Sequence, residues 1–145
     1  MTENKVIRAR GVMGPAVEGT VMVCPNSIQG WYGIDVKTGV ITEKGHVHEG
    51  KSIAGKILVL PCARGSLGWS NYFHNAFLNG VGPAAYVFTR MDSKCATTIL
   101  STNTPCVADF DLTRWDPCKV LRDGDIVRLD GDTGEITILE TQTES

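Results

Sequence analysis

Long apolar runs and clusters of basic residues are both missing from this sequence, and each absence excludes a class of function. No apolar stretch approaches the roughly 18 residues that a membrane-spanning helix requires, so we expect no membrane association. The first residues lack the apolar segment of a signal peptide, and we therefore expect a cytoplasmic protein. Lysine and arginine do not gather in any run, and the formal net charge is −2, so we expect no nucleic-acid partner.

Paired cysteines are also missing. The chain has 5 cysteines, an odd number and widely spaced, which argues against a disulfide framework. No two of them form a C-x-x-C pair, so we expect neither a zinc ribbon nor an iron–sulfur binding loop within this chain. We expect most of these thiols to be small core residues, as free cysteine usually is. The five are Cys24, Cys62, Cys95, Cys106 and Cys118.

Histidine is scarce, with 3 in the chain. His46 and His48 are two residues apart, so on a strand their side chains would share one face and could bind a metal ion. The sequence offers no obvious third ligand near them, and we expect a solvated loop pair instead. The sequence places neither this pair nor His74 where it would activate Cys62, which argues against a self-sufficient cysteine-dependent enzyme.

The chain that remains fits one compact domain, residues 1–145, ending in a polar tail at about residues 141–145. Its hydrophobic content of 42% is enough to supply a core. Residues 21–24 form a short apolar run typical of a strand. Residues 35–41 predict a tight turn that leads into another strand.

A similar turn string recurs at residues 130–136, near the end of the chain. It joins the alternating apolar segments 126–129 and 136–139, and this pattern predicts a C-terminal hairpin. We interpret the two strings as the same turn chemistry used twice and not as a domain repeat.

A strand, a loop, a helix and a second strand are predicted in the middle of the chain. The apolar run 57–60 is stopped by Pro61, and residues 84–88 form the next buried strand. A helix between them would give a right-handed parallel crossover. Its apolar face is marked by residues that recur at helical spacing, Trp69, Phe73, Ala76, Phe77 and Gly80.

A second, shorter helix is expected at roughly residues 94–100, with Asp92 or Ser93 as its cap. Residues 105–108 then return the chain to the sheet.

The loop after the strand at residues 57–60 carries the most informative residues. It delivers Arg64, Gly65 and Ser66 to the predicted helix start, where unpaired N–H groups carry partial positive charge. The planar guanidinium of Arg64 suits a carboxylate or phosphate, and Gly65 allows a close backbone approach or a positive φ. These features predict an anion-handling site. The alternative is a plain turn in which Ser66 merely caps the helix, and the spacing leaves both open.

Several strings along the chain also form a pattern. They are Ser-Ile-Ala-Gly-Lys-Ile-Leu-Val-Leu-Pro at residues 52–61, then Arg64-Gly65-Ser66, then Gly-Pro-Ala-Ala at residues 82–85. Gly-Ile-Asp at residues 33–35 with Thr38-Gly39, and the Gly-Asp hairpin downstream, match as well. Together these motifs resemble the small subunit, or swivel domain, of the aconitase X family, over nearly the whole chain.

This resemblance implies a fold and a function. The implied fold is of the α/β class, a swivelling β/β/α domain with a mixed, barrel-like sheet around the central strand-loop-helix-strand unit. Members of the family are hydro-lyases that dehydrate small hydroxy acids such as mevalonate 5-phosphate or cis-3-hydroxy-L-proline. The family's large subunit holds an iron–sulfur cluster. We therefore expect this chain to bind no cofactor, to pair with a large subunit and to be inactive alone.

The resemblance also assigns site residues. Ser66 would be the catalytic base that removes the C–H proton, and Arg64 and Gly65 would bind the substrate. A serine hydroxyl is a poor base, so it would need stabilisation from the helix N-terminus, the loop N–H groups and Arg64. Arg64 could instead hold a substrate carboxylate, and the sequence leaves both roles open.

The chain departs from the family pattern beside these residues. Cys62-Ala63 replaces the usual glycine or serine before the arginine, and bulky residues replace the usual run of small residues after Ser66. Among them, Trp69 and Tyr72 could reshape the pocket, which leaves the substrate open. The alternative function is a non-catalytic anion-binding or protein-interaction module of the same fold.

Overall fold

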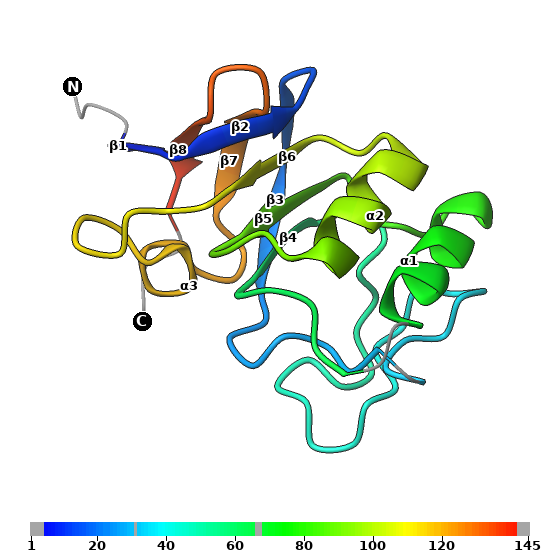
Figure 1. Ribbon diagram of the computed structural model, residues 1–145. Coiled ribbons are helices and arrows are strands. Elements are labelled where there is room, and N and C mark those ends of the chain that lie inside the picture. Colours follow the sequence, from blue (N-terminus) through cyan, green and yellow to red (C-terminus); the bar gives the residue numbers. More distant parts are fainter. Residues whose placement is uncertain (1–4, 31, 66–67, 142–145) are drawn as a thin grey trace.

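The computed structural model describes residues 5–30, 32–65 and 68–141, and in this part of the chain eight strands form one mixed sheet with three helices around it (Figure 1). The strand order is β1-β8-β7-β3-β4-β5-β6-β2. The strands are β1 Lys5–Arg8, β2 Arg10–Met13, β3 Val17–Val23, β4 Ile57–Leu60, β5 Ala85–Phe88, β6 Cys106–Ala108, β7 Ile126–Asp130 and β8 Glu135–Glu140. The helices are α1 Trp69–Leu78, α2 Ser93–Thr102 and α3 Pro117–Val120.

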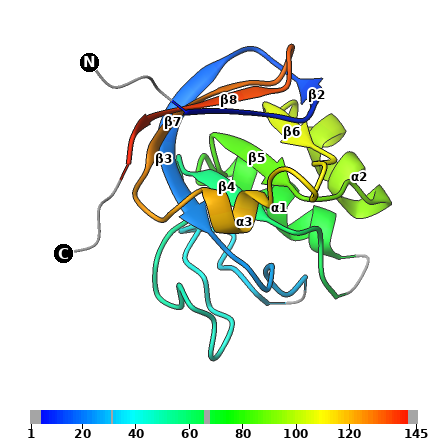
Figure 2. The same cartoon turned by 90° about the vertical axis from the view of Figure 1, so that its left-hand side faces the viewer.

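Strands β3, β4, β5 and β6 run parallel to one another, while β1, β2, β7 and β8 pair antiparallel with their neighbours. Helices α1 and α2 lie side by side on one face of the parallel strands. The antiparallel strands curl over the other face (Figure 2). The mixed, barrel-like sheet and the central strand-loop-helix-strand unit predicted from the sequence are therefore confirmed.

The period of two along each parallel strand divides the core into two clusters. All side chains of β4, β5 and β6 are buried, which explains their uninterrupted apolar sequences. Leu58, Leu60 and Phe88 pack toward α1 and α2, whereas Val59 and Val87 pack inside the curled sheet. Because both faces of these strands are covered, only their ends remain accessible to a ligand.

The segment between β3 and β4 differs from the prediction of a strand within residues 35–41. It forms a long loop with two isolated bridges inside it, Ile34 with Ile41 and Val40 with Ser52, and a third bridge, Gln29 with Arg64, joins it to the loop after β4. Local side-chain bonds explain why no strand forms. The Asp35 carboxylate accepts a hydrogen bond from Lys37 N at 2.8 Å, and a local hydrogen bond of this kind competes with the backbone ladder of a strand.

The helices follow the prediction with two exceptions on α1, because Gly80, expected on the apolar face, lies exposed beyond the end of the helix with a φ of +75°, and Phe77 is exposed as well. Trp69, Phe73 and Ala76 are buried on α1, but Phe77 is 45% exposed. At 100° per residue Phe77 lies about 80° round the helix from Trp69, at the edge of the apolar face. Of the two candidate caps of α2, Asp92 and Ser93, the cap is Asp92, whose carboxylate accepts from Cys95 N at 2.8 Å.

The predicted C-terminal hairpin is confirmed as β7 and β8, which pair from Ile126 opposite Glu140 to Asp130 opposite Glu135. At its turn, the Asp130 carboxylate accepts from Asp132 N at 2.9 Å, and Gly134 has a φ of +86°. Among the residues described, no helix is long and apolar enough to cross a bilayer.

Candidate functional site at the carboxyl edge of the parallel strands

The carboxyl ends of β3, β4, β5 and β6 meet at one edge of the sheet because these four strands are parallel. Ligands of open α/β sheets bind at this edge, where loops leave backbone groups and side chains free of the ladder. The loops that follow the four strands begin at Cys24, Pro61, Thr89 and Asp109. The predicted Arg64 loop is one of them.

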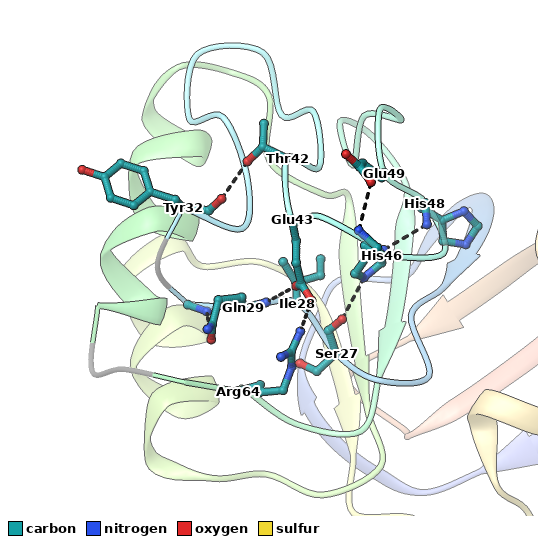
Figure 3. A network of polar contacts seen from close by, with 12 residues as sticks. Ser27, Ile28, Gln29, Tyr32, Thr42, Glu43, His46, His48, Glu49 and Arg64 are labelled. Atoms are coloured by element: carbon teal, nitrogen blue, oxygen red, sulfur yellow. Dashed lines mark hydrogen bonds and ion pairs between the residues drawn. The ribbon is translucent and has the colours of Figure 1, made fainter.

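Arg64 is held by a carboxylate from the long loop between β3 and β4 (Figure 3). Its Nη2 donates to Glu43 Oε2, and Glu43 Oε1 accepts from Gln29 N at 2.7 Å. Burial favours the neutral acid, but the Gln29 N–H and the guanidinium outweigh it and lower the pKa of Glu43 below its ordinary 4.5. Glu43 is therefore charged at neutral pH and fixes the position of Arg64.

Backbone contacts join the Arg64 loop to the loop after β3. Gly30 N donates to Arg64 O at 2.9 Å, and the Ser27 hydroxyl donates to Cys62 O. Gly65 has a φ of +88°, and a Cβ at that position would collide with the Gln29 side-chain oxygen. The positive φ therefore favours glycine at this position, and any larger residue would also displace the end of the Gln29 side chain.

The start of α1 is attached to the same loop. Trp69, the first residue of the helix, donates from Nε1 to Ile28 O at 3.0 Å, and its ring is fully buried against Phe73. The N-cap is Gly68, which has no side chain to cap the helix, so the N-cap position is not that of Ser66. Ser66 itself lies outside the described residues.

Tyr72 lies one turn further along α1 and reaches the surface. Its ring meets that of Tyr32 edge-on, with centroids 5.8 Å apart. The two rings line a hollow of about 650 Å³ with Ile34 and Asn75. The sequence suggested that Trp69 and Tyr72 could both reshape the pocket. The position of Tyr72 is compatible with this prediction. The prediction is wrong for Trp69, because the Trp69 side chain is buried in the core.

The histidine pair is not solvated as expected. His48 is 5% exposed, and its Nε2 lies 2.9 Å from Val23 O and 3.0 Å from Asp123 Oδ1. His46 Nε2 lies 2.8 Å from Ser27 O, while its Nδ1 accepts from His48 N at 3.0 Å. The oxygens that face both Nε2 atoms can only accept, so each Nε2 acts as the donor, and the two rings hold the loop after β3 in place.

The cysteines of this chain do not fit an iron–sulfur cluster. Cys24, Cys95 and Cys106 are fully buried, and burial raises the pKa of Cys24 and of Cys95 to about 12. Burial also raises the pKa of Cys118, to about 11, and a cluster needs thiolates. No group of three or more metal-ligating side chains occurs within the described ranges.

Glu43, Gln29 and Ser27 were missed by the sequence reasoning, although they build the surroundings of Arg64. Glu43 lies 21 residues from Arg64 in an irregular loop, with no motif to mark it. A signal was nevertheless available, because an arginine at a ligand-binding edge commonly has a carboxylate partner that positions it.

A model of the aconitase X swivel domain matches residues 6–138. The chain belongs to this family. It is 30% identical to the phosphomevalonate dehydratase small subunit of Methanocella arvoryzae over 132 residues, which cover 91% of this chain and 98% of the relative. It is 32% identical to that of Thermococcus kodakarensis over 134 residues, covering 92% and 96%.

A solved structure supports the same assignment. The crystal structure of Thermococcus kodakaraensis aconitase X in its holo-form has a chain that matches with a TM-score of 0.83 and 32% identity. The match covers 94% of this chain and 99% of that one. The resemblance predicted from the motifs, and the α/β swivel fold that it implied, are confirmed.

Proposed function

We propose that this chain is the small subunit of an aconitase X-type hydro-lyase, a single swivel domain that completes an active site on an iron–sulfur large subunit. The observation that carries the proposal is the likeness to phosphomevalonate dehydratase small subunits along more than nine-tenths of the chain. The position of the Arg64 loop at the carboxyl edge of the parallel strands supports it, since that edge is where such sheets bind ligands.

In this proposal Ser66 removes the proton from the carbon next to the substrate carboxylate, and the hydroxyl group leaves from the neighbouring carbon, for which the iron of the large subunit would supply the Lewis acid. A hydroxyl is a weak base, so the alkoxide must be stabilised where it forms. Arg64 and Gly65 precede Ser66 on the same loop, and the Glu43 carboxylate fixes the Arg64 side chain. Because the guanidinium is already held in place, it does not have to move when negative charge develops near it, and no free energy is lost in reorganising it.

Arg64 keeps donors for a substrate in addition to its bond with Glu43. A guanidinium has five N–H groups, and the contact to Glu43 runs through Nη2. The remaining donors can bind a carboxylate, and Gly65 lets the backbone approach that group closely. Arg64 and Gly65 are therefore proposed as substrate-binding residues.

The iron–sulfur cluster is assigned to the large subunit, because the thiols described in this chain are poorly suited to it. Cys24, Cys95 and Cys106 are buried in the core, and no group of three or more metal-ligating side chains occurs among the described residues. The contribution of this chain is to bind and orient the acid and to accept its proton.

Mevalonate 5-phosphate is the favoured substrate. The relatives at about 30% identity are phosphomevalonate dehydratase small subunits from several archaea, and the aligned region spans nearly all of each. The other substrate type expected from the family, cis-3-hydroxy-L-proline, is the comparison compound in any assay.

A non-catalytic anion-binding or interaction module is the alternative, and the Glu43–Arg64 pair is the observation in its favour. A guanidinium already neutralised by a carboxylate could serve only to hold two loops together. The two functions differ in whether a complex of this chain turns over a hydroxy acid.

The test is purification of this chain with its native partner, followed by an ultraviolet assay of product formed from mevalonate 5-phosphate and cis-3-hydroxy-L-proline. We expect a partner of large-subunit size that carries iron and sulfide, and turnover only by the complex. Isolation of a stable complex with an iron-free partner and no dehydratase activity would contradict the proposal.

A further inference from the structure

A second cavity opens at the same edge of the sheet, beside the Arg64 loop. It has a volume of about 330 Å³. Its walls come from the loops after three neighbouring parallel strands: Pro61 and Cys62 after β4, Thr89 and Arg90 after β5, and Asp109 and Phe110 after β6. The chemistry proposed for Arg64, Gly65 and Ser66 does not use this cavity, which we call the Arg90 cavity.

Backbone hydrogen bonds fix its walls beyond the end of the sheet. Thr89 N donates to Leu60 O at 3.1 Å, and Arg90 N donates to Pro61 O at 3.0 Å. Phe110 N donates to Thr89 O at 3.0 Å. The three loops therefore continue the ladder for one or two residues, and the cavity is formed before any ligand binds.

The acidic group in the wall is already neutralised. Asp109 Oδ2 accepts from Arg10 Nε at 2.7 Å, and Asp109 Oδ1 accepts from Met91 N at 2.8 Å. Burial works against the charge, but these two contacts outweigh it and lower the pKa of Asp109. Asp109 also has a φ of 62°, a conformation uncommon outside glycine, and its side-chain bonds hold it there.

Arg90 is left as the uncompensated charge of the cavity. Its side chain is exposed, and within the described part of the chain it makes no ion pair or side-chain hydrogen bond. The rest of the lining is largely apolar, from Pro61, Phe110 and Leu112. A guanidinium beside an apolar wall suits a ligand with a short carbon chain that ends in an oxyanion.

The Arg90 cavity and the Arg64 site are neighbours. Cys62 lines the cavity, and Arg64 follows two residues later on the same loop. The strands that precede the two arginines, β4 and β5, are paired along their whole length, from Ile57 with Ala85 to Leu60 with Phe88. Arg64 and Arg90 therefore follow adjacent parallel strands at the same edge of the sheet.

We propose that Arg90 binds the distal phosphate of the substrate while Arg64 faces the end that reacts. This inference rests on the proposed function and extends it, because it assigns the substrate to phosphorylated hydroxy acids with two anionic ends. Arg90 is then a specificity residue and takes no part in proton transfer. A zwitterionic acid such as cis-3-hydroxy-L-proline has no group for this cavity.

The first test measures steady-state kinetics of the complex with mevalonate 5-phosphate and with unphosphorylated mevalonate. For Arg90→Gln we expect KM for the phosphorylated acid to rise at least tenfold, with kcat within twofold of wild type. KM for mevalonate should stay unchanged. Arg128→Gln, on the exposed face of β7, is the matched control and should alter neither. An equal rise for both substrates, or no rise, would overturn the proposal.

The second test uses the full chain without its partner, so that it does not depend on turnover. Inorganic phosphate is titrated while backbone amide and arginine Nε–H signals are followed by NMR. We expect saturable shifts centred on Thr89, Arg90 and Phe110 that disappear in Arg90→Gln and persist in Arg128→Gln. Shifts centred on Arg64, stronger shifts with acetate than with phosphate, or no Arg90-dependent shift would refute the assignment. A complex that turns over no hydroxy acid would instead refute the proposed function.

Discussion

Glu43 and Arg64 are 21 residues apart in the sequence and lie on two different loops. Their contact determines how the guanidinium is presented at the edge of the sheet. Glu43 uses one carboxylate oxygen for Arg64 and the other for Gln29 N, so the acid joins two loops through one side chain. Arg64 is 42% exposed, which leaves part of the guanidinium open to a ligand. A carboxylate in this position orients the arginine and keeps it from turning into solvent.

Lysine should replace Arg64 poorly. Lysine keeps the charge but loses the planar fork that can bind Glu43 and a substrate oxyanion at once. We expect Arg64→Lys to lower kcat/KM of the complex at least tenfold, equivalent to about 1.4 kcal/mol of transition-state stabilisation. A change mainly in KM indicates substrate binding, and one mainly in kcat indicates support of the base. Arg128→Lys is the control, and wild-type kinetics for Arg64→Lys would refute the role.

Glu43 should make stability depend on pH in the acid range. Its pKa in the folded chain lies below the ordinary 4.5, so the carboxylate stabilises the fold above pH 4.5 and loses this effect as the pH falls through the folded-state pKa. Glu43→Gln should therefore cost about 1 kcal/mol at neutral pH and progressively less below pH 4.5.

Urea denaturation at a series of pH values measures this difference. Glu18→Gln is the matched control, since Glu18 is exposed and lies 3.9 Å from Arg128. A constant gap between wild type and Glu43→Gln from neutral to acid pH would show that the Glu43 charge does not stabilise the fold.

The elements around the site could be predicted where burial alone determines them. β4 and β5 are buried on both faces, so their apolar sequences are visible without any knowledge of their neighbours. The Asp92 cap follows from a local hydrogen bond, and Asp92 was one of the two caps that the sequence offered, with Ser93. Phe77 was misjudged because an edge position on α1 is decided by what packs beside the helix.

The loops were less predictable because their contacts are long-range. His48 looks like an exposed loop residue in the sequence, yet it is buried, and its Nε2 lies 3.0 Å from an oxygen of Asp123, which is 75 residues away. The pairing of Glu43 with Arg64 has the same origin, since no local pattern encodes it. The Arg64 loop could be found from the motif, whereas its supports required the tertiary structure.

Gly65 gives a test at the level of the loop. Replacement by alanine places a Cβ against the Gln29 side chain and also costs about 1–2 kcal/mol because φ is positive. Gly45→Ala is the matched control, because Gly45 has a φ of +80° with nothing within 4 Å of an added Cβ. We expect Gly65→Ala to be the less stable of the two variants by thermal melting and to lower kcat/KM, while Gly45→Ala keeps full activity. Equal effects on both would mean that Gln29 does not constrain the loop.

At the scale of the whole molecule, the curled sheet presents four parallel strand ends at one edge, and both proposed arginines lie there. Three of the five cysteine side chains, those of Cys24, Cys95 and Cys106, are buried in the core. This arrangement is what a subunit needs if it closes over a cofactor held by another chain and supplies substrate contacts.

The isolated chain should therefore fold and yet be inactive. It carries the proposed base, and its described residues contain no group of three or more side chains that could hold a metal ion. A cooperative thermal transition together with no product from a panel of hydroxy acids is the expected result. Turnover by the metal-free chain without a partner would show that the shared site is wrong.

The most direct test of the central claim is Ser66→Ala, measured as kcat of the reconstituted complex beside thermal melting and partner binding. We expect kcat to fall to a small fraction of the wild-type value while the melting temperature and the affinity for the partner stay nearly unchanged. A serine that takes no part in the proton transfer would instead leave kcat at the wild-type value. Normal kcat with a lowered melting temperature would contradict the proposal that Ser66 is the base.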